Sequence, residues 1–150
     1  MKYIGPDFCN ITTLLSDEEL LIQKTANEFV VKEFMPLVNE YYEKGSFPTE
    51  LIPKMGELGF FGATLPKKYG GSEISSTAYG LIMQELEKGD SGLRSVCSVQ
   101  GGLVMYPIFQ YGTEEQKDKW LPQLAAGDAI GCFGLTESNH GSDPGGMTTK

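Results

Sequence analysis

Two short patterns that begin α-helices constrain this chain more than any other feature. Ser16 is followed three residues later by Glu19, and Thr113 is followed three residues later by Gln116. In such a capping box, the side chain of each residue accepts a hydrogen bond from the backbone N–H of the other, which satisfies donors that the first turn leaves unpaired. Amphipathic helices are therefore expected from residue 16 toward Pro36 and from residue 113 to about residue 124.

Glycines, prolines and a further cap divide the rest of the chain. Helices are expected over residues 49–58, 75–88 and 95–106, with Gly59 and Gly127 each ending a helix. Gly89 is expected in the left-handed conformation, and Asp90 is expected to cap the next helix. The nearly uncharged run 95–106 predicts a helix buried on most sides.

The end of the chain changes character. Residues 129–135 are short, apolar and free of helix caps, as a β-strand would be. The expected fold is mainly α, with about six helices in a domain formed by residues 1–128 and the first strand of a β-domain in residues 129–150. Because a lone strand cannot form a sheet, its partners are expected in residues outside this sequence or in another chain.

Charge and composition exclude several classes of protein. The 20 acidic and 12 basic side chains give a net charge of −8, which opposes the phosphate neutralisation that nucleic-acid binding requires. No apolar run is long enough to span a bilayer, and the first residues lack a signal-peptide pattern, so a soluble intracellular protein is expected. Cys9, Cys97 and Cys132 are expected to be free thiols, the latter two buried, and no metal site is predicted.

Arg94 and Ser98 form the first candidate binding site. Four residues apart on a helix, they share one face and can hold one carboxylate between them. An arginine in these apolar surroundings needs a partner charge, which Glu87 or Asp90 could supply. The alternative interpretation is a structural ion pair between Arg94 and Glu87 without a ligand.

The loop over residues 135–144 is the second candidate site. It concentrates hydroxyls, small side chains and backbone donors, a composition that suits an anion or a cofactor ring. Gly141 permits close approach of a ligand to the backbone, and Ser142 offers a hydroxyl. A plain turn is the alternative, because the pattern matches neither common phosphate-binding glycine motif. His140 is expected to be an exposed loop residue, since no ligand-spaced companion accompanies it.

These segments together resemble the acyl-CoA dehydrogenase family over residues 15–150. Residues 133–144, with Thr-Glu and then Gly-Ser-Asp, resemble the flavin-loop signature of that family, although Ser138 stands where proline is usual. Residues 111–127, residues 56–62 and the Tyr-Gly-Gly of residues 69–71 are similar to the helices and loop of its N-terminal helical domain. Residues 85–100 are similar to the glutaryl-CoA dehydrogenase type.

The resemblance implies roles for individual residues. Arg94 and Ser98, with Ser95 beside them, would bind the distal carboxylate of the substrate, and Glu87 would support Arg94. FAD would be the cofactor, and Ser142 would also approach the CoA end of the substrate. The implied FAD-binding residues are Phe133, Gly134, Leu135, Thr136, Gly141 and Ser142.

The resemblance also implies properties of the complete enzyme. Its catalytic base would be a glutamate beyond residue 150, so no catalytic residue is assigned here. It would convert glutaryl-CoA to crotonyl-CoA and carbon dioxide, pass electrons to an electron-transferring flavoprotein and form a homotetramer. The expected location is the cytoplasm in a bacterium or the mitochondrial matrix in a eukaryote. A short-chain monocarboxylic acyl-CoA dehydrogenase and a non-catalytic helical interaction module are the alternatives.

Overall fold

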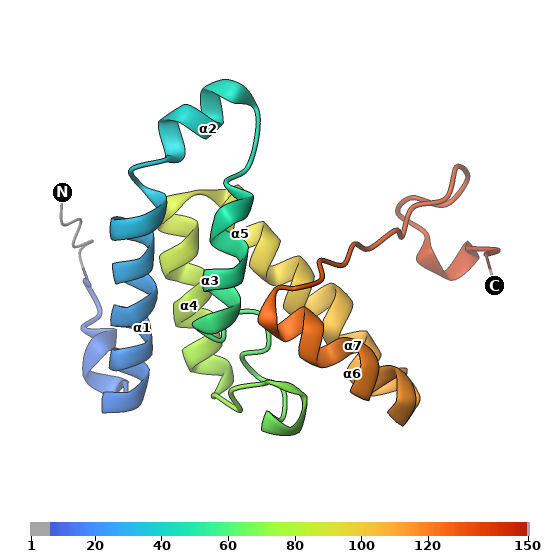
Figure 1. Ribbon diagram of the computed structural model, residues 1–150, viewed down its shortest axis with the longest axis horizontal. Coiled ribbons are helices and arrows are strands. Elements are labelled where there is room, and N and C mark those ends of the chain that lie inside the picture. The colour runs from blue at the N-terminus through green and yellow to red at the C-terminus, as the bar shows by residue number, and fades with distance from the viewer. Residues whose placement is uncertain (1–6, 150) are drawn as a thin grey trace.

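The computed structural model describes residues 7–149, which form a helical bundle with an extended C-terminal segment (Figure 1). The α-helices are α1 (Asp17–Phe29), α2 (Val38–Lys44), α3 (Ile52–Glu57), α4 (Ser76–Gly89), α5 (Ser91–Ser98), α6 (Tyr106–Tyr111) and α7 (Glu114–Ala126). Shorter helical turns are η1 (Ile11–Leu14), η2 (Val30–Phe34), η3 (Thr49–Leu51), η4 (Lys67–Tyr69), η5 (Val99–Met105) and η6 (Pro144–Gly146). The wider turns of η2 and η5 continue α1 and α5, so α5, η5 and α6 make one long helical run. The predicted mainly helical class is confirmed.

Both predicted capping boxes form. The Ser16 hydroxyl accepts from the Glu19 backbone N–H at 3.3 Å, and the Ser16 N–H donates to the Glu19 carboxylate at 3.0 Å. Thr113 and Gln116 repeat the exchange at the start of α7, with distances of 3.3 Å and 2.9 Å. Gly127 adopts the left-handed conformation, with φ of 79°, and ends α7 as predicted.

The corner between α4 and α5 differs from the prediction. Gly89 is the last helical residue of α4 and lacks a positive φ, so the left-handed assignment was wrong. Its small size serves packing, because a Cβ at this position would lie 2.8 Å from Cγ1 of Val30. Asp90 caps α5 as predicted, with its carboxylate accepting from the Gly92 N–H at 2.6 Å. The corner therefore turns within one residue.

The core lies between α1, α3, α4, α5 and α7, and a buried carboxylate joins two of these helices. Glu85 of α4 is only 2% exposed. It accepts from the side-chain amides of Gln23 and Asn27 on α1, both at 3.0 Å, and pairs with Lys88 at 2.6 Å. A buried charge needs such partners, so this cluster fixes the register between α1 and α4.

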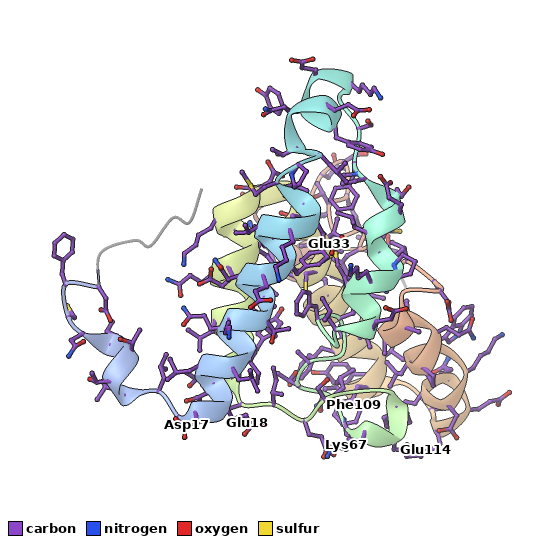
Figure 2. The ribbon with its side chains drawn as sticks, turned by 60° about the vertical axis from the view of Figure 1, so that its left-hand side comes forward. Asp17, Glu18, Glu33, Lys67, Phe109 and Glu114 are labelled. Carbon is purple, nitrogen blue, oxygen red and sulfur yellow. The ribbon has the colours of Figure 1, made fainter. Side chains whose placement is uncertain are left out.

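The segment between α3 and α4 crosses to the far end of the bundle. Tyr69 packs edge-on against Phe109 of α6, with ring centroids 6.0 Å apart. The hydroxyl of Tyr69 donates to Glu114 of α7 at 3.1 Å, and Lys68 pairs with the same carboxylate at 3.3 Å. Lys67, Phe109 and Glu114 gather at this end of the molecule (Figure 2).

The long helical run is less buried than its composition predicts. Cys97 and Met105 are fully buried, whereas Leu103 is 45% exposed and Tyr106 is 50% exposed. The expectation of burial on most sides holds for only part of the run, because Gly102, Leu103 and Tyr106 are exposed. Cys97 is buried as predicted, but Cys132 is exposed, contrary to the prediction.

The predicted strand over residues 129–135 does not form within the described residues. These residues run irregularly away from the bundle, and the described chain has a single isolated antiparallel bridge, between Glu137 and His140 (Figure 1). A strand exists only through pairing with another strand, and residues 7–149 supply no partner for this segment. Within residues 7–149, every helix is too short or too polar to span a bilayer.

Candidate functional site

The α4–α5 corner brings Arg94, Ser98 and Glu87 together. Glu87 lies in the last turn of α4, and Arg94 and Ser98 lie one turn apart on α5. The guanidinium Nε donates to the Glu87 carboxylate at 2.7 Å, and Nη1 donates to the Ser98 hydroxyl at 3.2 Å. The predicted grouping of these three side chains therefore forms within this chain.

The electrostatics of the group favour an ionised Glu87 and an available guanidinium. Hydrogen bonds from Ser91 and Arg94 hold the pKa of Glu87 below its ordinary value. Glu87 and Arg94 keep 47% and 36% of their side-chain surface exposed. Of the five N–H donors of a guanidinium, two are used, and Nη2 has no acceptor among the described residues. The group can therefore still receive an anion.

Ser95 and Tyr79 flank this group. Ser95 is half-buried, and its backbone carbonyl accepts the Ser98 hydroxyl at 3.2 Å. Its own hydroxyl touches neither Arg94 nor Ser98 by a hydrogen bond, so the structure gives it no direct part in the cluster. Burial raises the pKa of the Tyr79 hydroxyl, and the nearby charge of Arg94 opposes that rise. Tyr79 is thus a neutral, half-buried neighbour of the guanidinium.

The loop residues form an open segment beyond Gly131. Phe133 and Leu135 are 48% and 43% exposed, and the backbone N–H groups of residues 132–136 donate to no acceptor in the described part of the chain. A Cβ built on Gly134 or Gly141 would meet no atom within 4 Å. The segment thus offers unpaired donors and an accessible backbone to a ligand.

A compact turn follows this open segment. The Glu137 carboxylate accepts from the backbone N–H of Thr149 at 2.8 Å and from that of Thr148 at 2.9 Å. The Thr149 side chain, together with the backbone N–H groups of Thr148 and Thr149, lowers the pKa of Glu137 to about 2. His140 is half-buried, contrary to the expected exposure, and its Nδ1 lies 3.5 Å from the Asp143 carboxylate. Glu137 therefore holds the turn closed and is not a free base.

The two predicted groups do not meet. The turn that carries Gly141 and Ser142 lies well away from α5 and the Arg94 cluster (Figure 1). The predicted substrate contact by Ser142 is thus separate from the contact by Arg94 and Ser98.

Gln100 is a buried side chain that sequence reasoning overlooked, and it connects the helix that carries Arg94 to the segment that leads to the loop. It is the one large polar side chain in the uncharged run 95–106, and that isolation was the available signal.

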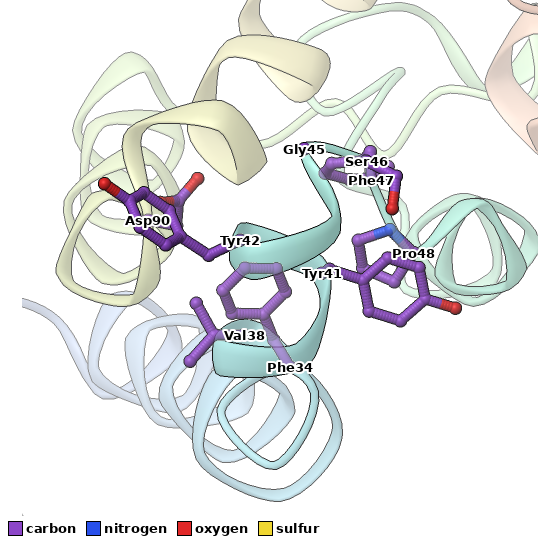
Figure 3. A pocket seen from close by; sticks show the side chains of 9 residues that line it. All are labelled: Phe34, Val38, Tyr41, Tyr42, Gly45, Ser46, Phe47, Pro48 and Asp90. Carbon is purple, nitrogen blue, oxygen red and sulfur yellow. The ribbon is translucent and has the colours of Figure 1, made fainter.

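A pocket of about 240 Å³ lies elsewhere, beside α2 (Figure 3). Four aromatic rings and the carboxylate of Asp90 contribute to its walls. None of the predicted binding residues lines it. Its lining consists of Phe34, Val38, Tyr41, Tyr42, Gly45, Ser46, Phe47, Pro48 and Asp90.

The fold and its polar groups define a helical domain that presents a guanidinium and an open, donor-rich loop. Residues 16–128 match the family described as "Acyl-CoA dehydrogenase, N-terminal domain". The chain belongs to the acyl-CoA dehydrogenase family.

Individual relatives agree with this assignment. The chain is 41% identical over 138 residues to a probable acyl-CoA dehydrogenase, YngJ, of Bacillus subtilis, covering 91% of this chain and 36% of the relative. A crystal structure of a glutaryl-CoA dehydrogenase from Mycobacterium smegmatis in complex with FADH2 is 48% identical with a TM-score of 0.91, covering 95% and 37% of the two chains. Butyryl-CoA dehydrogenase from Megasphaera elsdenii is 40% identical with a TM-score of 0.81, covering 90% and 36%. The chain thus spans little more than a third of the length of these relatives.

Proposed function

We propose that this chain is the N-terminal domain of a FAD-dependent acyl-CoA dehydrogenase whose substrate is a dicarboxylic acyl-CoA, most simply glutaryl-CoA. The observation that carries the proposal is the Arg94 guanidinium, which is bonded to Glu87 and Ser98 and retains unused donors. In this proposal Arg94 and Ser98 bind the distal carboxylate of the acyl chain.

The arrangement of the cluster supports a dicarboxylic substrate over a monocarboxylic one. The Glu87 carboxylate accepts the hydrogen bond from Nε of Arg94. This contact orients the planar guanidinium and leaves Nη2 for a second carboxylate. A substrate that ends in a methyl group would cover these donors without pairing them, which is costly for a charged group. A site rejects a substrate that leaves its polar groups unpaired more strongly than it rejects one that differs only by a methylene in chain length.

The loop residues fit one edge of a flavin. Unpaired backbone donors along residues 132–136, the Thr136 hydroxyl and the open backbone at Gly134 and Gly141 match a ring edge rich in acceptors. Leu135 and Thr136 would bind that edge, and Phe133 would offer an exposed ring beside it. Ser142 would bind a diphosphate or the CoA end of the substrate. Bound FAD would supply the oxidant that removes hydride from the β-carbon of the acyl thioester.

The remaining properties belong to the complete enzyme. Residues 129–150 would begin its middle β-domain, where the extended segment gains strand partners. Glutaryl-CoA would lose its distal carboxylate as carbon dioxide and leave crotonyl-CoA, so Arg94 must hold a group that departs during the reaction. An electron-transferring flavoprotein would accept the electrons, and the enzyme would be a homotetramer.

Anaerobic mixing of the complete enzyme with glutaryl-CoA or butyryl-CoA tests the proposal. The expected result is loss of the oxidised-flavin absorbance and release of carbon dioxide with glutaryl-CoA, and slow or no bleaching with butyryl-CoA. Faster bleaching with butyryl-CoA would favour the monocarboxylic alternative, to which the similarity with butyryl-CoA dehydrogenase lends support. A complete protein without flavin would contradict the enzymatic proposal as a whole.

A further inference from the structure

Gln100 occupies an unusual position for a polar side chain. It lies in η5, is 1% exposed and is surrounded by the core. Its side-chain Nε2 donates to the carbonyl of Leu124 at 2.9 Å and to the carbonyl of Ala129 at 2.8 Å. Its Oε1 accepts from the backbone N–H of Gly131 at 3.0 Å. Both amide hydrogens and the amide oxygen are therefore used on backbone groups of one neighbouring segment.

These bonds act at the point where the chain leaves the bundle. The Leu124 carbonyl lies in the last turn of α7, where its one backbone partner among the described residues is the Gly127 N–H at 3.3 Å. Ala129 and Gly131 are the first residues of the segment that leads to the open loop. The planar amide of Gln100 thus links the end of α7 to the start of the loop segment. It fixes the direction in which the chain leaves the bundle after α7.

Close packing at Gly131 strengthens the same restraint. Val104 lies one turn beyond Gln100, and a Cβ on Gly131 would stand 2.4 Å from its Cγ1. The segment therefore lies directly on η5, held by hydrogen bonds at Gln100 and by contact at Val104. Beyond Gly131, residues 132–136 donate no backbone hydrogen bond within the described chain, so the restraint ends there.

We infer that Gln100 is a positioning residue that aims the flavin-binding segment 132–136 relative to the carboxylate-binding pair. The inference rests on the proposed function for the identity of the ligand, but the restraint itself does not. Arg94, Ser98 and Gln100 lie on the continuous helical run formed by α5 and η5. The same run therefore carries the side chains proposed to bind the substrate and the side chain that holds the loop segment. Side chains on a rigid element hold a site more precisely than side chains on a loop.

Amide hydrogen exchange on the 150-residue chain tests the restraint without any cofactor. In the unsubstituted chain, the Gly131 N–H should exchange at least about tenfold more slowly than the N–H groups of Phe133 and Leu135. Gln100→Asn keeps the amide but shortens its reach, and it should remove that difference. Gln123→Asn is the matched control, because the Gln123 side chain is exposed on α7 and donates only to the Lys119 carbonyl among described residues. Equal exchange at the three amides of the unsubstituted chain would overturn the inference.

FAD dissociation from the complete enzyme tests the functional part. Gln100→Asn should speed the loss of FAD by about tenfold, because two tethers of the segment are weakened. The ratio of activity with glutaryl-CoA to that with butyryl-CoA should stay unchanged, since Arg94 and Ser98 are intact. Ile82→Ala, which removes buried side-chain atoms from α4 and leaves α7 and η5 unchanged, should leave FAD dissociation unaltered. Equal rates of FAD loss in both variants would give Gln100 a structural role only and overturn the inference. A complete enzyme that never binds FAD would instead contradict the proposed function, and the hydrogen-exchange result would be unaffected.

Discussion

Replacement of Glu85 by alanine should destabilise the helical domain more than any surface substitution. The carboxylate is 2% exposed and accepts from two amides of α1, Gln23 and Asn27, while Lys88 pairs with it from one turn away. Alanine would leave three donors without this acceptor. Gln23 and Asn27 are half-buried and Lys88 is 34% exposed, so water can replace part of the loss.

The expected magnitude follows from these contacts. A hydrogen bond to a charged group contributes about 1.5–3 kcal/mol, and removal of one partner of a buried pair costs about 3–5 kcal/mol. With partial access of water, the free energy of unfolding should fall by about 3–4 kcal/mol. For a domain of this size the melting temperature should fall by about 10 °C.

Urea unfolding followed by far-ultraviolet circular dichroism measures this change directly. Glu85→Gln preserves the shape but places an amide hydrogen near the donors of its neighbours, so an intermediate loss of about 1–2 kcal/mol is expected. Glu43→Ala on α2 is the control for removing a glutamate, because Glu43 is exposed and its loss should change stability by less than about 0.5 kcal/mol. If Glu85→Ala matched Glu43→Ala, the buried cluster would not stabilise the α1–α4 pair as argued.

Two further predictions concern backbone packing and pH. Gly56→Ala should lower the free energy of unfolding by about 1–3 kcal/mol, because its Cβ would lie 2.1 Å from the Ala126 carbonyl oxygen. Gly80→Ala, in open space on α4, should raise it by about 0.4–1 kcal/mol in the same urea unfolding experiment. Similar effects of the two changes would contradict the close α3–α7 contact. The pKa of Glu137 is lowered from 4.5 to about 2, so its stabilisation of the C-terminal turn should be complete above pH 4.5 and lost as the pH falls toward 2. Amide exchange at Thr149 should show that loss, and loss of protection already at pH 5 would refute the assignment.

The starts of α1, α5 and α7 and the end of α7 were predictable from the sequence because local chemistry determines them. Ser16, Thr113 and Asp90 cap helices through side chains only a few residues away, and Gly127 ends one through its own backbone freedom. Gly89 misled the prediction, since its small size serves a contact with Val30 from another helix. Such packing depends on the tertiary fold and leaves no local pattern.

The candidate site was predictable in part for the same reason. The pairing of Arg94 with Ser98 follows from helical spacing, and the contact with Glu87 follows from a corner only one residue long. Strand formation over residues 129–135 depends on partners that the described chain does not contain. The tether at Gln100 joins residues about 30 positions apart, so it became visible only with the fold.

The most direct test of the central claim compares Arg94→Met with the unsubstituted complete enzyme on two substrates. If Arg94 binds the distal carboxylate, kcat/KM for glutaryl-CoA should fall by about 10- to 150-fold, the equivalent of one charged hydrogen-bonded contact, while kcat/KM for butyryl-CoA stays constant or rises. An equal loss with both substrates, or no loss with glutaryl-CoA, would contradict carboxylate binding and leave the Arg94–Glu87 contact as a structural ion pair.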